Sequence, residues 1–121
     1  MARVTGFGGL FFRSKDNKAL AAWYEKHLGI NGMAWQQEAG PTVFAPFKQD
    51  TSYFGNDAQQ FMMNFRVEGL DALIAQLKAD GVRVDDNRME ESYGKFAWIY
   101  DLDGNKIELW EPAEESGKEA E

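Results

Sequence analysis

The sequence predicts an α+β fold made of two similar units, each with the order strand–helix–strand–strand–strand. Short runs of alternating apolar and polar residues, typical of strands, are interleaved with two segments whose apolar residues follow helical spacing. The pattern then restarts: Gly29 closes the first helical segment and Gly81 closes the second. We therefore expect one domain with units at residues 1–56 and 57–112, followed by an acidic, disordered tail at residues 113–121.

The first unit is expected to hold a strand, a helix and three short strands. The helix begins after Asp16, a residue type that caps helix N-termini, and ends at Gly29. A Gly40-Pro41 pair and a polar patch at residues 48–50 separate the later strands. The strand-like runs are residues 4–13, 33–38, 42–47 and 51–54.

The second unit repeats this plan and ends in two strands joined by an Asp-Leu-Asp-Gly-Asn turn. Its helix is lined by Leu70, Leu73, Ile74 and Leu77, and its strands are expected at residues 60–67, 82–84, 96–100 and 106–110. The acidic and amide residues at 101, 103 and 105 are interpreted as turn chemistry, because the spacing lacks the other ligands of a calcium loop.

Alternation along the last strand sets the orientation of its side chains. Ile107 and Leu109 are expected on one face, and Lys106, Glu108 and Trp110 on the other. Glu108 is then an acid beside an indole. From the residues alone it is a metal ligand, a base or hydrogen-bond anchor shielded by Trp110, or an exposed carboxylate on a sheet face.

Composition excludes several classes of protein. The net charge of −7 gives no basic footprint for nucleic acid, and five of the acids lie at residues 111–121, so the remainder is only mildly acidic. The chain has no cysteine, which rules out disulfides and thiolate metal sites. It also has no signal-peptide pattern and no apolar run long enough to span a membrane. We expect a cytoplasmic protein with no membrane or nucleic-acid partner.

Three segments carry a resemblance that covers nearly the whole chain apart from the tail: WYEKHLGI, FMMNFRVEGLDALIAQLKADGV and DLDGNKIELWEP. Together with the repeat, they resemble the vicinal-oxygen-chelate (VOC) superfamily, which contains glyoxalase I, extradiol dioxygenases and bleomycin-resistance proteins. The resemblance implies two βαβββ modules that form a glyoxalase-like paired-sheet cleft for a small organic molecule. It also implies a homodimer that completes the clefts.

The resemblance further implies four positions for the ligands of a divalent metal, and this sequence fills one of them, with Glu108. The other positions hold residues that are poor ligands for such metals: Gly8 or Gly9, Met62 or Gln60, and the acid-free residues 51–55. The single histidine, His27, falls near a helix end and is interpreted as a packing residue. We expect no cofactor and no metal-dependent glyoxalase I activity, with a divalent metal as the alternative.

Residues of matching parity on the predicted strands outline a ligand pocket with aromatic and methionine walls. Arg13 is a candidate partner for Glu108 or for an anionic ligand, and each apolar member is also consistent with ordinary core. The predicted pocket consists of Phe11, Arg13, Met62, Asn64, Phe96, Trp98, Glu108 and Trp110.

Two functions follow, with a third left open. The first is a VOC-like protein that binds a small organic ligand without a complete metal site. The alternative is a VOC enzyme of the lyase or dioxygenase type, in which Glu108 is the catalytic base or a partial metal ligand. A regulatory or interaction module is the third interpretation, because a fold does not fix a function.

Overall fold

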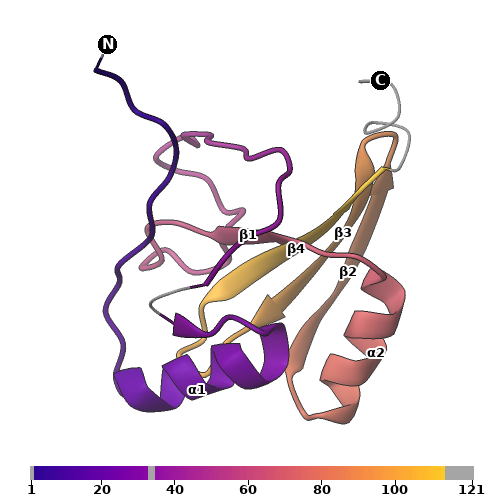
Figure 1. The fold of residues 1–121 in the computed structure, drawn as a ribbon. Helices are drawn as coiled ribbons and strands as arrows, with labels where there is room; N and C mark the ends of the chain where they lie inside the picture. Colours follow the sequence, from indigo (N-terminus) through magenta and orange to yellow (C-terminus); the bar gives the residue numbers. More distant parts are fainter. Residues whose placement is uncertain (1, 33–34, 114–121) are drawn as a thin grey trace.

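The computed structural model describes residues 2–32 and 35–113, and within them it contains two helices and one four-stranded sheet (Figure 1). The sheet has the order β1-β4-β3-β2, with β1 parallel to β4 and the other neighbours antiparallel. This arrangement confirms the α+β class and the strand–helix–strand–strand–strand order of the second unit. The elements are α1 (Asn17–Leu28), β1 (Met63–Arg66), α2 (Leu70–Ala79), β2 (Arg83–Glu91), β3 (Gly94–Tyr100) and β4 (Lys106–Pro112).

Helix α1 begins and ends where its sequence predicts. The Asp16 side chain accepts a hydrogen bond from the Ala19 backbone N–H at 3.1 Å, which satisfies one of the unpaired donors of the first turn. Gly29 ends the helix in the left-handed conformation with φ of 71°. Both boundaries of the first predicted helix are therefore confirmed.

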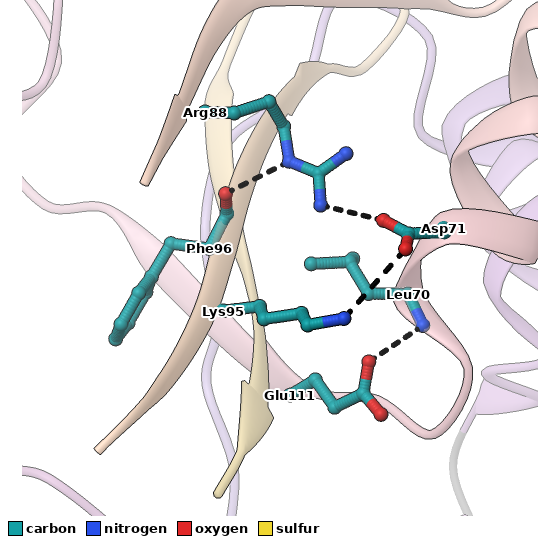
Figure 2. Close-up of polar contacts among 6 residues, drawn as sticks. All are labelled: Leu70, Asp71, Arg88, Lys95, Phe96 and Glu111. Atoms are coloured by element: carbon teal, nitrogen blue, oxygen red, sulfur yellow. Dashed lines mark hydrogen bonds and ion pairs between the residues drawn. The ribbon is translucent and has the colours of Figure 1, made fainter. Parts of the chain in front are cut away.

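Helix α2 takes its N-terminal cap from a distant strand. Gly69 precedes the helix and has no side chain to offer, but Glu111 of β4 accepts a hydrogen bond from the Leu70 N–H at 2.9 Å (Figure 2). Beside it, Asp71 pairs with Arg88 of β2 at 2.8 Å and with Lys95 of β3 at 3.7 Å. The first turn of α2 is thus attached to three strands.

The hydrophobic core lies between the two helices and one face of the sheet. Ile107 and Leu109 of β4 are completely buried in it, as the alternation of that strand predicts, and Glu108 and Trp110 lie on the opposite face. The buried residues of this cluster are Leu20, Trp23 and Tyr24 of α1, Leu70, Ile74 and Leu77 of α2, and Val82, Ala97, Ile99, Ile107 and Leu109.

The strands predicted in the first unit are wrong for the residues that the structure describes. Apolar alternation favours an extended chain, but a strand also needs a neighbour to pair its backbone groups, and these segments pair neither with one another nor with β1. Their apolar side chains remain exposed, with Val4 at 89%, Phe11 at 91% and Phe44 at 83%. The segments without strand structure are residues 4–13, 35–38, 42–47 and 51–54, while residues 33 and 34 of the second run lie outside the described ranges.

The turn between β3 and β4 is held by Asp101, which confirms its interpretation as turn chemistry. One carboxylate oxygen of Asp101 accepts from the backbone N–H groups of Asp103 and Asn105, at 2.9 and 3.0 Å. The other accepts from the Tyr24 hydroxyl at 2.6 Å, which ties the turn to α1. Burial and this carboxylate raise the pKa of Tyr24 far above its ordinary value.

His27 packs in the helix layer, with its ring 5.1 Å from that of Trp23 and its Nδ1 3.9 Å from an Asp80 carboxylate oxygen. This placement confirms its interpretation as a packing residue. Across residues 2–32 and 35–113, no helix has the length and apolar character needed to cross a membrane. Of the predicted acidic tail, all but residue 113 lies outside the described ranges.

Candidate functional site: a cavity on the face of the sheet opposite the helices

A cavity of about 1080 Å³ opens on the face of the sheet that the helices leave uncovered. This volume is at the upper end of the range for drug-sized ligand sites. The sheet contributes Asn64, Met89, Phe96, Glu108 and Trp110. Most of the remaining lining comes from residues 43–62, which precede β1.

Strand register explains why these side chains meet. Glu108 of β4 lies between Asn64 of β1 and Trp98 of β3, so the three form one row across the sheet. One step along, Phe96 of β3 lies between Trp110 of β4 and Met89 of β2. Because side chains two residues apart on a strand share a face, both rows lie on the face of the sheet that borders the cavity.

Glu108 is buried, at 9% exposure, and its carboxylate accepts hydrogen bonds from three neutral donors. One oxygen, Oε1, accepts from the Asn64 side-chain amide at 2.6 Å. The other, Oε2, accepts from the Trp98 indole N–H at 3.0 Å and from the Tyr53 hydroxyl. The carboxylate therefore organises three side chains from β1, β3 and the preceding loop.

Burial raises the pKa of Tyr53 well above its ordinary value, and the hydrogen bond to Glu108 raises it further. Its hydroxyl stays protonated and donates to the carboxylate. The loop that carries Tyr53 is held to β4 by Lys106, whose ammonium donates to the Tyr53 carbonyl at 2.9 Å. The Gln59 side chain bonds both the N–H and the C=O of the Lys106 backbone, at 2.9 Å each, in place of a neighbouring strand.

Aromatic rings form one wall of the cavity. Phe96 and Trp110 are nearly parallel, with an interplanar angle of 3° and ring centroids 6.1 Å apart, and Tyr93 meets Phe96 edge-on. Gly94 makes this arrangement possible: its φ is 145°, and a Cβ there would lie 2.6 Å from the Trp110 indole nitrogen. The indole N–H is held by the Tyr93 carbonyl at 3.2 Å.

The structure brings together most, but not all, of the residues predicted for the pocket. Met62, Asn64, Phe96, Glu108 and Trp110 line the cavity, whereas Trp98 is buried, does not line it, and bonds to Glu108. Phe11 is exposed and does not line it. Arg13 lies instead in a shallow depression with Ser14, Lys15 and Asp103, so the predicted Arg13–Glu108 pair does not form among the described residues.

Sequence reasoning missed Tyr53, Gln59 and Lys106, which hold the loop on the cavity. Tyr53 and Glu108 are 55 residues apart in the chain, and no local pattern signals such a contact. One signal was present: alternation places Lys106 on the same face as Glu108.

Comparison with solved structures identifies the fold. TnmS3, an antibiotic binding protein from Streptomyces sp. CB03234, superposes with a TM-score of 0.63 at 22% identity, over 93% of this chain and 100% of that one. A glyoxylase/bleomycin resistance protein/dioxygenase domain from Frankia sp. EAN1pec gives 0.61 at 16% identity, over 92% and 100%. The trypanothione-dependent glyoxalase I of Leishmania major gives 0.55 at 21% identity, over 90% and 86%.

The chain has the VOC fold. This confirms the glyoxalase-like α+β fold that the sequence motifs predict, with one of the two predicted sheets formed among residues 2–32 and 35–113. In sequence, no family model and no curated protein matches the chain.

The VOC fold implies a divalent metal, and the residues present do not fit one. The Glu108 carboxylate is surrounded by the phenol of Tyr53, the amide of Asn64 and the indole of Trp98. None of these groups is a strong ligand for zinc, nickel or iron. Among residues 2–32 and 35–113, no three histidine, cysteine, aspartate or glutamate side chains are grouped to hold an ion. The arrangement is suited to binding through stacking and hydrogen bonds.

Proposed function

We propose that this protein binds a planar aromatic small molecule in the cavity and does not transform it. The stacked rings of Phe96 and Trp110 carry this proposal, because both residues line the cavity of about 1080 Å³ and a flat aromatic ligand can extend such a stack. Met62 and Met89 add polarisable apolar surface beside it. The structural neighbour TnmS3 is described as an antibiotic binding protein, which supports a binding role for such a cavity.

Glu108 acts in this proposal as a structural anchor of the site. A general base needs a carboxylate oxygen within reach of the proton that it abstracts. Both oxygens of Glu108 are already occupied, by Asn64 on one side and by Trp98 and Tyr53 on the other. A ligand proton could therefore reach only the remaining lone pair of Oε1, beside the Asn64 amide, because Oε2 already accepts two hydrogen bonds.

We also propose that the site works without a resident metal. The absence of a suitable donor set in the described ranges supports this, since one carboxylate with neutral neighbours gives weak affinity for a divalent ion. Elemental analysis of protein purified without chelators tests it. Stoichiometric metal that disappears in Glu108→Ala would overturn the metal-free proposal and favour the enzyme alternative.

A homodimer completes the proposal. Exposed apolar side chains are concentrated in the segments that were predicted as strands. They include Val4, Phe7 and Phe11 near the N-terminus, and Val43 and Phe44 at the start of the lining segment of residues 43–62. A second copy offers partners for both the side chains and the unpaired backbone of these segments. Light scattering after size exclusion should give twice the mass of the chain, and Phe7→Asp with Phe11→Asp should give one chain mass. A monomeric wild-type protein would contradict this part.

The binding proposal is tested with a panel of three-ring planar aromatic molecules, by thermal shift and by calorimetric titration. Binders should raise the melting temperature of the wild-type protein. Trp110→Leu and Phe96→Leu should each weaken binding by about two- to tenfold, since ring–ring stacking is worth about 0.5–1.5 kcal/mol. Leu102→Ala, which shortens an exposed apolar side chain outside the cavity, is the control. A panel without binders, or equal losses in the control, would contradict the proposal.

A further inference from the structure

We propose that the cavity selects organic cations, so that its ligand is a planar aromatic molecule carrying a protonated amine or a quaternary ammonium group. This inference rests on the proposed binding function and adds the charge of the ligand to it. Four features of the cavity support it: the charges of its lining, the hydrogen-bond partners of Glu108, its aromatic rings, and its free acceptor oxygens.

The charged residues that line the cavity are three carboxylates and one ammonium. Asp50 and Asp57 lie on the exposed part of the lining, Glu108 is buried in the sheet, and Lys48 is the cation. A buried charge interacts more strongly than an exposed one, because the surrounding medium screens it less. The field inside the cavity therefore favours a positive ligand.

The charge of Glu108 is not cancelled by an ion pair among the described residues. Its three donors are the neutral groups of Tyr53, Asn64 and Trp98. The nearby ammonium of Lys106 donates to the Tyr53 carbonyl at 2.9 Å, and Lys106 does not line the cavity. A ligand cation in the cavity can therefore approach the Glu108 carboxylate without contacting the Lys106 ammonium.

Aromatic faces favour the same sign of charge. The face of an aromatic ring is the negative end of its quadrupole, and cations bind over it. Lys106 already shows this preference inside the protein, with its ammonium 5.3 Å from the Tyr53 ring centroid and 5.6 Å from that of Trp98. Phe96 and Trp110, which stack on each other, also line the cavity, and a stacked pair keeps outer faces of this kind.

The hydrogen-bonding groups of the site match a ligand that donates. The Tyr53 hydroxyl donates its hydrogen bond to Glu108, so its oxygen has only acceptor capacity left for a ligand. The Asn64 amide donates one of its two N–H groups to Glu108, and its carbonyl oxygen remains an acceptor. An ammonium N–H complements both of these oxygens.

The experiment compares three-ring probes that share a shape and differ in charge: 9-aminoacridine as the cation, 9-anthracenecarboxylate as the anion and 9-anthracenemethanol as the neutral molecule. Each is titrated calorimetrically into the full chain at neutral pH. The cation should bind about tenfold tighter than the anion, which corresponds to a difference of about 1.4 kcal/mol in binding free energy. The preference should shrink when salt rises from about 0.05 M to about 0.5 M, because salt screens the exposed part of the field.

Matched variants separate the field of the cavity from the net charge of the protein. Asp50→Asn with Asp57→Asn removes two charges from the lining and should lower the affinity for the cation several-fold while raising that for the anion. Glu25→Gln with Glu68→Gln removes two exposed charges outside the cavity and should change neither.

The possible outcomes are distinguishable. Equal affinities, a preference for the anion, or equal effects of the two double variants would overturn the inference while leaving the binding function intact. If none of the three probes binds, the proposed function itself fails.

Discussion

Trp98 and Glu108 lie directly opposite each other on β3 and β4, and the indole N–H of Trp98 donates to the Glu108 carboxylate at 3.0 Å. An acid and an indole are thus joined across two strands on the cavity face, while the residues on either side of Glu108, Ile107 and Leu109, are in the core. A buried carboxylate is costly unless hydrogen bonds satisfy it, and this pair supplies one of the three bonds that do so.

Replacing Glu108 should destabilise the protein more than its small change in size suggests. Glu108→Gln keeps the shape but turns one acceptor oxygen into a donor, so at least one of the Tyr53, Trp98 and Asn64 donors loses its partner. The expected loss is about 1–3 kcal/mol in the free energy of unfolding. Urea denaturation measures it.

Asn64→Leu is the companion variant, because at this exposed position it keeps a side chain of similar size, removes a single donor and leaves the carboxylate with two. It should cost less than Glu108→Gln in the same titration, and Glu25→Gln, on the exposed face of α1, should cost almost nothing. Equal stability of wild type and Glu108→Gln would show that the carboxylate does not anchor the site.

Gly94→Ala should disrupt the aromatic wall. The residue has φ of 145°, a conformation that L side chains rarely adopt, and a methyl group there would lie 2.6 Å from the Trp110 indole nitrogen. The backbone strain alone costs about 1–3 kcal/mol, and Trp110 must also move. We expect lower stability together with a shifted tryptophan emission spectrum.

The control for this variant is Gly104→Ala, in the turn between β3 and β4, where φ is 82° and nothing lies within 4 Å of the added methyl group. It carries backbone strain without the contact to Trp110, so its stability should fall while its emission spectrum matches that of the wild type. If Gly94→Ala also leaves the emission spectrum unchanged, Trp110 does not occupy the position described.

The three buried or half-buried tyrosines that bond to carboxylates should make the protein lose stability in alkali. Burial and the partners Asp101 and Glu108 raise the pKa values of Tyr24 and Tyr53 above their usual 10.0. Burial and Asp85 do the same for Tyr100. The folded state therefore keeps protons that the unfolded state releases, and this contribution is complete below pH 10 and decreases as the pH rises further.

Near-ultraviolet absorbance follows phenolate formation in this range, and urea denaturation at each pH gives the stability. Tyr53→Phe should remove part of the alkaline decrease, because phenylalanine has no proton to lose. An unchanged stability between pH 9 and 11 would contradict the raised pKa values.

The two units show which parts of a fold are local and which are not. The order of the second unit was predictable because its strands pair with each other, so the alternation around Ile107 also gives the face that the sheet buries. The extent of β2 was not, since it runs to Glu91 instead of ending at the predicted residue 84. In the first unit the helix was predictable from Asp16 and Gly29, whose effects are local. The runs at residues 4–13 and 42–47 alternate equally well, but the described chain gives them no strand partner.

The same distinction applies to the site. Asn64, Phe96 and Trp110 were predictable, because strand parity fixes the face on which they lie. Tyr53 was not, since its place beside Glu108 depends on a loop whose path is set by the Gln59 and Lys106 contacts. Long-range side-chain bonds of this kind leave no periodic trace in the sequence.

Glu111 should stabilise the protein by capping α2 from outside the helix. The helix has no side-chain cap of its own after Gly69, and the Glu111 carboxylate accepts from the Leu70 N–H at 2.9 Å, where a negative charge also favours the positive end of the helix dipole (Figure 2). Glu111→Ala should therefore lower the free energy of unfolding by about 0.5–2 kcal/mol, the usual cost of losing a cap.

Glu111→Gln separates the hydrogen bond from the charge, since its amide oxygen still accepts from Leu70, and its loss should be intermediate. Asp71→Ala is the matched control: its pairs with Arg88 and Lys95 are exposed, and such pairs contribute little. Hydrogen exchange at the Leu70 amide gives a local reading, which should become faster in Glu111→Ala and change little in Asp71→Ala. Equal losses in the two alanine variants would mean that the cap contributes no more than a surface ion pair, and that packing of Leu70, Ile74 and Leu77 alone holds α2 on the sheet.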